Sequence, residues 1–278
     1  MPFKVYVDSR FRQDTGGSNT NCEFTVELPH PIQVRGRAYI DVILVPNTFY
    51  VVRAGENDRL HLRENASTYR IAVIAEGQYN AITLKDALLF ALNTGKSMTG
   101  NYTASFDSLS NKYTIGNLDD TATFHVYPTK WLKANASTWN SFVSATAVPQ
   151  ISGATLMDIG SVLGFNSWEI LSGNDTIAIV APDVVNLLPY HQLFLRSSIG
   201  TGYDAIGPDG SSDIIRRITC QVPLNSIIVD QHSQPHDSVN VGNREVTSMS
   251  FRLTDVYGKT VNTNGHHISL SVIFLEDE

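Results

Sequence analysis

The sequence predicts an all-β protein, a single jelly-roll β-sandwich with an inserted small α+β domain. Apolar and polar residues alternate with a period of two in about eight segments outside the middle of the chain, and eight is the strand number of a jelly roll. The middle of the chain has a helical pattern that the flanks lack. The last thirty residues of this alternating pattern, Val246 to Leu275, are apolar enough to require partners on both edges.

These last residues predict a hairpin. Its first strand has Met249, Phe251 and Leu253 at alternate positions, and its second strand runs from Ile268 to Phe274 with the same alternation. Asn264-Gly265 between them is a pair that tolerates positive φ in a tight turn.

The matching partner for the hairpin is the segment in which Phe24, Val26 and Leu28 alternate with polar residues, before Pro29 and Pro31. Proline cannot donate to a strand ladder, so the strand is predicted to end there. We expect the end of the chain to pair with this early strand, which is the closure of a jelly roll.

Residues 1–20 are predicted to form a flexible N-terminal arm. A short alternating piece at 3–7 is followed by a polar, glycine-containing stretch that cannot hold a core. The arm is either a frayed terminus or a segment that orders only on a neighbouring subunit. Arg10 and Arg12 are the residues expected to anchor it through a subunit contact.

The jelly-roll domain is predicted to comprise residues 21–66 and 176–278, with the inserted α+β domain at 67–175. Within 67–175, a strand at 69–74 precedes a helix that begins near Thr83 and Asp86 and ends at Thr94-Gly95, and a second short helix is expected at 156–163. Strand-only sequence on both sides is typical of a domain inserted into a loop. The polar stretches 197–212 and 230–243 are predicted loops.

Composition disfavours several classes of partner. The net charge of −7 over 278 residues does not predict a nucleic-acid or anionic-membrane surface. We find no apolar run of bilayer-spanning length and no apolar signal region, so synthesis in a host cytoplasm or nucleus is expected. Cys22 and Cys220 are predicted free thiols that act as small apolar fillers.

Taken in order, several landmarks resemble the penton, or minor capsid, proteins of the polinton, adintovirus and virophage group of double-stranded DNA viruses. The landmarks extend over the whole chain and are Val7-Asp8-Ser9-Arg10, Phe24-Thr25-Val26-Glu27-Leu28-Pro29, Gly77-Gln78-Tyr79 before Thr83-Leu84, Leu163-Gly164-Phe165, and Phe251-Arg252-Leu253-Thr254-Asp255 with Gly258 and Asn264-Gly265. Each motif is short, and their order and spacing carry the resemblance. The inserted domain cannot be matched residue by residue.

The resemblance implies a structural protein of the virion. Such proteins are single jelly rolls that form homopentamers at the fivefold vertices of an icosahedral capsid, next to the major capsid protein of the same virus. It implies no catalytic residues and no cofactor.

Other groups of residues have part of the pattern of a known chemical site. Gly95-Lys96-Ser97 and Gly258-Lys259-Thr260 end like phosphate loops, but the glycine that should stand five residues earlier is Phe90 or Leu253. His232, His236 and His266-His267, with Asp230 and Asp237, are either a metal site or solvated loop side chains, and the second interpretation is favoured. A middle alternative is that protonation of these histidines weakens a subunit contact.

Three function classes follow, with the capsid protein first. The second is a receptor- or glycan-binding head, for which the candidate stacking residues are Trp131, Trp139, Trp168, Tyr102 and Tyr127. Packing inside the inserted domain is the competing role for at least two of the tryptophans. The third, a hydrolase or lyase, is weakest, because we find no nucleophile elbow, paired Cys-x-x-Cys or zinc-binding His-Glu-x-x-His motif.

Overall fold

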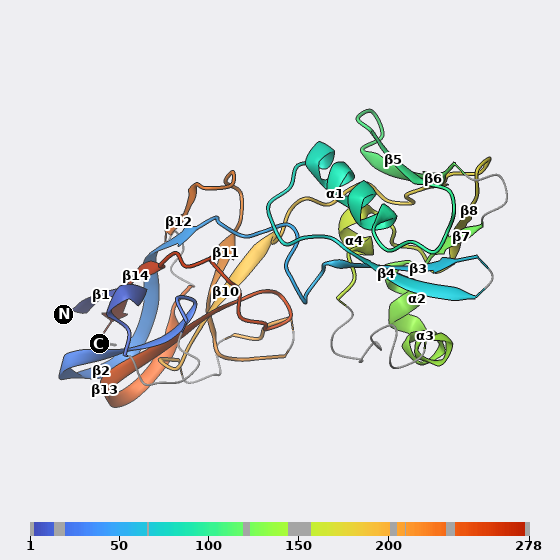
Figure 1. The fold of residues 1–278 in the computed structure, drawn as a ribbon. Helices are drawn as coiled ribbons and strands as arrows, with labels where there is room; N and C mark the ends of the chain where they lie inside the picture. Colours follow the sequence, from blue (N-terminus) through green and yellow to red (C-terminus); the bar gives the residue numbers. More distant parts are fainter. Residues whose placement is uncertain are drawn as a thin grey trace. The chain divides into compact units, whose positions relative to one another are not determined.

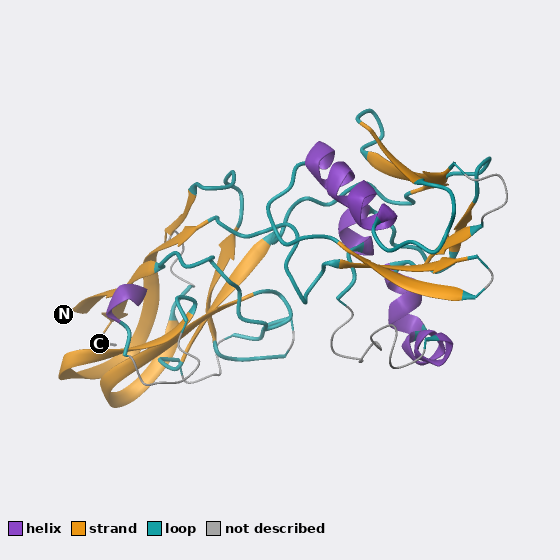
Figure 2. Ribbon diagram, viewed as in Figure 1, coloured by secondary structure: helices purple, strands orange, loops and turns teal. Residues whose placement is uncertain are grey.

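The computed structural model describes residues 3–13, 20–65, 67–118, 123–143, 157–200, 205–208, 210–231 and 237–275. The chain divides into two compact units (Figure 1): unit 1 consists of Met1–Phe49 and Tyr190–Glu278, and unit 2 of Tyr50–Pro189. Strands dominate, and the α-helices of the described residues lie in unit 2. The short purple helix near the N-terminus in Figure 2 is the 3-10 helix η1 (Ser9–Phe11) of unit 1. The prediction of a mostly β chain is confirmed.

Along the chain, the limits between the units differ from the domain limits expected at 67 and 175. Strand β3 (Arg59–Glu64) pairs with β4 (Thr68–Val73), so a limit at residue 67 would cut through one hairpin. Strand β9 (Ile179–Val180), expected in the jelly roll, pairs instead with β6 (Lys112–Asn117) of unit 2.

In its described residues, unit 1 has seven antiparallel strands that form two groups. They are β1 (Phe3–Asp8), β2 (Glu23–Pro46), β10 (Gln192–Ser197), β11 (Ile214–Thr219), β12 (Ile227–Gln231), β13 (Val239–Thr254) and β14 (Ser269–Leu275). The long strand β2 belongs to both groups. Its first part pairs with β13, which leads to β10 and β11, and its second part pairs with β14 and β12, with β1 beyond β14.

A glycine pair marks the point where β2 passes from one group to the other. Gly36 lies opposite Gly242, and their φ angles are 96° and 70°. L side chains are strained at such angles, so glycine is required there. The register of β13 also shifts between Asn240 and Gly242, and a bulge of this kind bends the strand.

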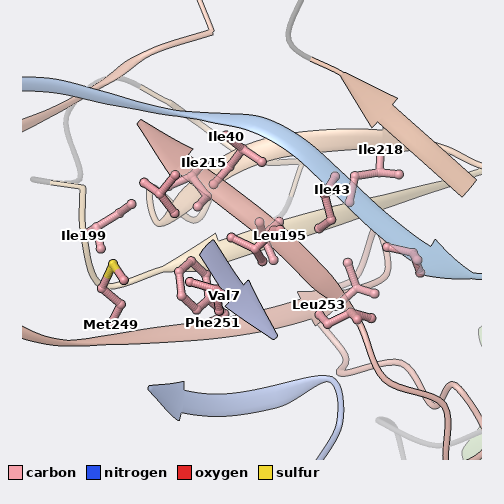
Figure 3. Close-up of a cluster of buried hydrophobic side chains, with 14 of the residues drawn as sticks. Val7, Ile40, Ile43, Leu195, Ile199, Ile215, Ile218, Met249, Phe251 and Leu253 are labelled. Atoms are coloured by element: carbon pink, nitrogen blue, oxygen red, sulfur yellow. The ribbon is translucent and has the colours of Figure 1, made fainter. Parts of the chain in front are cut away.

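One hydrophobic core fills the space between the two groups. Figure 3 shows Val7 of β1 and Ile43 of β2 together with Leu195 of β10, Ile218 of β11 and Phe251 of β13 in one cluster. All five side chains are at most 3% exposed. Side chains from both groups thus pack against each other, which makes unit 1 a sandwich-like pair of antiparallel layers.

The predicted hairpin at the end of the chain is wrong. Within the described residues β13 and β14 do not pair with each other, because β2 lies between them. The early segment Phe24–Leu28 pairs with β13, where Phe24 lies opposite Phe251, and not with the last strand. Alternation identifies the strands, but a large loop can connect strands that belong to different layers.

The predicted flexible arm also requires correction. Phe3–Asp8 forms strand β1, which pairs with β14 in the register Val7 opposite Leu270. Residues 14–19 of the predicted arm lie outside the described residues. The predicted loop at 230–243 contains the end of β12 and the start of β13 as well.

Unit 2 combines two small sheets with helices, in agreement with the predicted α+β character. One sheet has the order β4-β3-β7-β8 and the other β5-β6-β9. The remaining elements are β5 (Tyr102–Asp107), β7 (Phe124–Val126), β8 (Leu171–Gly173), α1 (Ala81–Asn93), α2 (Thr129–Ala134), α3 (Ala136–Phe142) and α4 (Gly160–Leu163).

Helix α1 begins at Ala81, two residues before the predicted start at Thr83. Asn80 is the N-cap, and its side-chain oxygen accepts hydrogen bonds from the N–H groups of Ile82 and Thr83, both at 2.9 Å. The Thr83 hydroxyl accepts from the Asn80 N–H in return. Leu84 and Leu88 of this helix are fully buried.

Candidate functional site

The first candidate site is the corner where β1 leads into the 3-10 helix η1 (Ser9–Phe11). Asp8 caps η1, because its Oδ1 accepts a hydrogen bond from the Arg10 N–H at 2.9 Å. The Arg10 guanidinium binds the same carboxylate through Nε (3.0 Å) and Nη2 (2.7 Å). The hydrogen bond from Arg10 lowers the pKa of Asp8. The Arg10 side chain remains 65% exposed, so a second molecule can reach it.

Arg12 lies deeper in the same corner. Its Nη1 donates to the Ser9 carbonyl at 3.2 Å and to Asn21 Oδ1 at 2.9 Å, which ties η1 to the start of β2. The Arg12 Nε is buried and has no hydrogen-bond partner among the residues that the structure describes. The two predicted anchor residues thus differ, because Arg10 faces solvent whereas Arg12 is hydrogen-bonded within its own chain. Their role as subunit contacts stays a prediction.

A pocket of about 490 Å³ opens beside this corner, over β1, β14 and the second part of β2. Its lining is mainly apolar and includes Tyr6, Phe11, Val42 and Leu44. An ion pair between Lys4 Nζ and Asp41 Oδ2 (2.6 Å) lies beside it. The pocket resembles in size the sites that take apolar groups oriented by a few polar ones.

Ser9, His267 and Asp8 have the residue types of a nucleophile, base and acid. The Ser9 hydroxyl lies 3.1 Å from His267 Nδ1 and also accepts a hydrogen bond from the Ile268 N–H. Ser9 is fully buried, however, and the Asp8 carboxylate is bound to Arg10. A substrate cannot reach the hydroxyl, so this arrangement is structural.

The residues suggested as a metal site are not brought together in the described part of the structure. His232 and His236 lie outside the described residues, whereas Asp230 and Asp237 both bind Arg216. Arg216 Nε lies 2.5 Å from Asp230 Oδ2, and its Nη1 binds Asp237. Over the ranges that the structure describes, no group of three His, Cys, Asp or Glu side chains is placed to hold a metal ion.

The residues that resemble phosphate loops make bonds within their own chain. Lys96 Nζ donates to the Gly100 carbonyl at 2.6 Å, and the Ser97 hydroxyl donates to Glu64 at 2.6 Å. The Thr260 hydroxyl donates to Glu23 at 3.0 Å. Because these polar groups bind other groups of their own chain, neither segment forms a phosphate-binding loop.

Sequence reasoning missed a buried carboxylate in unit 2. Glu64 is fully buried and accepts hydrogen bonds from Arg70 Nε (2.8 Å), the Ser97 N–H and hydroxyl (both 2.6 Å) and the Tyr102 hydroxyl (2.9 Å). Arg70 also donates to three carbonyls at the end of α1. Burial and the nearby Glu64 charge raise the pKa of Tyr102. Glu64 stands at an inward position in the alternating pattern of β3. This alternation is the sequence signal that could have identified it as buried.

The structure separates the five aromatic residues proposed for ligand stacking. Trp139, Tyr102 and Tyr127 are at most 2% exposed, so they pack in unit 2 and cannot stack on a ligand. Trp168 is 67% exposed and Trp131 is partly buried. The backbone N–H of Trp131 donates to the backbone carbonyl of Ser167, so Trp131 and Trp168 lie on adjoining segments.

The fold defines a class of protein: a β-sandwich of two antiparallel strand groups that carries an α+β unit between residues 49 and 190 of its chain. No helix in the described part of the chain is both long and apolar enough to cross a membrane.

No family model matches the chain, and no curated protein matches it. The structure is similar to the crystal structure of the selenomethionine-labelled mavirus penton protein. The TM-score is 0.49, the sequence identity is 9%, and the alignment covers 100% of each chain.

Proposed function

We propose that this protein is a viral structural protein, a penton capsomer that occupies the fivefold vertices of an icosahedral capsid as a homopentamer. Its partners are further copies of itself and the major capsid protein of the same virus, and its site of action is the virion. The role is structural, with no catalytic step and no cofactor.

The observation that carries the proposal is the closure of unit 1 by its own ends. β1 pairs with β14, and β14 pairs with β2. The chain leaves unit 1 after Phe49 and returns to it at Tyr190. Counting the two parts of β2 separately, the two strand groups have four members each, which agrees with a jelly roll. The ordered sequence landmarks that resemble penton proteins support the same assignment.

Electron microscopy of negatively stained protein tests this function directly. The protein should be purified alone and after co-expression with the major capsid protein, and class averages should be sorted by symmetry. Rings of five copies are expected. A single copy in both preparations, or rings with another number of copies, would overturn the proposal.

The exposure of Trp168 favours a second candidate function, recognition of a host receptor or glycan by unit 2. A large aromatic side chain at the surface offers a flat apolar face with a polar N–H at its edge. Glycan-array binding that is lost in Trp168→Ala, with unchanged thermal unfolding, would support this function. Absence of binding by the unaltered protein would exclude glycans as the ligand.

A further inference from the structure

One face of the sheet β4-β3-β7-β8 in unit 2 carries three polar side chains in a row, Arg63 of β3, His125 of β7 and Ser172 of β8, which we call the polar row. Arg63 lies opposite His125, and His125 lies opposite Ser172. Residues directly opposite each other in a sheet share a face. Leu62 and Val126, next to these positions in the chain, are buried in the core of unit 2. The polar row therefore lies on the face directed away from that core.

Hydrogen bonds within the polar row determine the tautomer of His125. Arg63 Nη2 lies 2.6 Å from His125 Nε2, and His125 Nδ1 lies 2.7 Å from Ser172 Oγ. A guanidinium can only donate, so Nε2 must accept, and Nδ1 carries the ring hydrogen and donates to Ser172. His125 is therefore no base toward Ser172. The hydroxyl hydrogen of Ser172, an exposed residue, is left to donate to another molecule.

Arg63 differs from the other arginines of unit 2, which each have a carboxylate partner, in the pairs Arg53–Glu56, Arg59–Asp58 and Arg70–Glu64. Among the described residues Arg63 binds only the neutral His125, and its Nε is buried without an acceptor. A cation partly withdrawn from water without a counter-ion is costly. Arg63 is still partly exposed, so an anion from outside the chain can reach it.

The charge of the polar row matches a ligand with one negative charge. Burial, together with the nearby Arg63 charge, lowers the pKa of His125, so its ring is neutral at pH 7. Arg63 then carries the formal charge of the row, which matches a monoanion better than a doubly charged phosphate. The planar fork of guanidinium donors fits a carboxylate.

The spacing of the polar row sets the size of the ligand. Neighbouring strands lie about 4.8 Å apart, so the backbone positions of Arg63 and Ser172 are separated by about 10 Å across β7. A lone carboxylate is too small to bind both side chains, whereas a sugar ring that carries a carboxylate and hydroxyl groups can do so.

We propose that the polar row binds a carboxylate-bearing sugar. The carboxylate accepts hydrogen bonds from Arg63, and a hydroxyl oxygen of the same sugar accepts one from Ser172. The proposal rests on the second candidate function, glycan recognition by unit 2, and assigns acidic sugars to it. Trp168, the exposed aromatic residue of that function, lies just before β8, which carries Ser172.

Isothermal titration calorimetry of the whole chain tests the site with matched ligands. The methyl glycosides of N-acetylneuraminic acid and glucuronic acid are compared with their uncharged methyl esters and with acetate. At least one acid should bind at least about tenfold more tightly than its ester and than acetate, because the hydrogen bonds from Arg63 are charge-assisted.

Three variants assign this binding to the polar row. Arg63→Gln should remove the preference for the acid over its ester, and Ser172→Ala should weaken binding of the acid about threefold to tenfold. Lys85→Gln, on α1, removes the same charge elsewhere in unit 2 and should bind like the unaltered protein. NMR titration adds a second reading, because the acid offsets the Arg63 charge. The pKa of His125 should therefore be higher with the acid bound than with the ester bound.

The possible results separate this site from the function on which it rests. Equal binding of acids and esters, acetate binding as tight as that of either acid, or tighter binding of an acetylated aspartate peptide would overturn the proposal. If neither acid binds while Trp168-dependent binding to a glycan array persists, the acidic-sugar site is wrong and glycan recognition stands. Absence of binding in both assays would overturn both. The acid–ester comparison uses the unaltered protein, so it does not depend on the folding of any variant.

Discussion

Val7 of the first strand lies opposite Leu270 of the last strand, and both side chains are at most 4% exposed. This pair places the two ends of a 278-residue chain next to each other in one layer. Because β14 pairs with β2 on its other side, the apolar last strand has both edges covered. Closure of unit 1 therefore depends on β1.

Val7→Ala should destabilise unit 1. Removing two methyl groups from a packed core leaves a small cavity, and we expect a loss of about 1–3 kcal/mol in the free energy of unfolding. The matched control is Tyr6→Ala on the same strand, whose exposed side chain should contribute within about 0.5 kcal/mol in the single chain.

Circular dichroism during urea unfolding measures this effect. All three tryptophans, at 131, 139 and 168, lie in unit 2, so tryptophan fluorescence provides an internal reference. The fluorescence transition should not move in Val7→Ala. Equal stability of the two variants would show that β1 adds nothing to unit 1.

Glu64→Ala should destabilise unit 2. The substitution leaves Arg70 without its buried carboxylate and removes the acceptor of the Tyr102 hydroxyl. Breaking a buried ion pair from one side costs about 3–5 kcal/mol. Asp86→Ala is the control, because Asp86 pairs with Lys85 at the surface, where such pairs contribute about 0–1 kcal/mol. Tryptophan fluorescence during urea unfolding measures both variants, and similar losses would refute a stabilising role for the Glu64 network.

Arg10→Ala should raise the pKa of Asp8 toward its ordinary value of 3.8, because the lowered pKa arises mainly from the Arg10 hydrogen bond. A carboxyl with a lowered pKa stabilises the folded state above pH 3.8, and this contribution is lost as the pH falls through its folded pKa. Titration of the Asp8 carboxyl carbon by NMR checks the shift. Identical titration curves in the two proteins would rule out the Arg10–Asp8 pair in solution.

Cys220 should react slowly with iodoacetamide. Burial raises its pKa to about 11, so at pH 8 about one thiol in a thousand is the reactive thiolate. Because the folded pKa lies above the unfolded value, Cys220 should lower stability only as the pH rises from about 9 toward 11. Peptide mapping after timed labelling gives the rate, with the urea-unfolded chain as the fast reference. Equally rapid labelling of the folded chain would contradict the partial burial of this thiol.

Local pattern was sufficient to predict most strands but not their partners. Alternation at Phe24 and Phe251 identifies two strands correctly, and in the structure these two residues face each other. The prolines at 29 and 31 were expected to end the early strand, yet β2 continues through them. They lie where the register with β13 shifts between Val246 and Ser248, so their missing N–H groups cost no ladder bond.

The sequence predicts less of the candidate site than of the strands. Residues Phe3–Asp8 resemble a frayed end because the stretch after them is polar, and only the pairing with β14 reveals Val7 as a core residue. The exposure of Ile227, Val229 and Tyr257 could not be read from the sequence either, because an apolar residue is expected inside unless the structure shows otherwise.

The number of copies in the assembly tests the central claim, that a sandwich closed by its own two ends forms a ring with copies of itself. Native mass spectrometry should be performed on the protein alone and together with the major capsid protein. We expect a complex with five times the mass of one chain. A single chain in both samples, or a complex with any other number of copies, would contradict the claim.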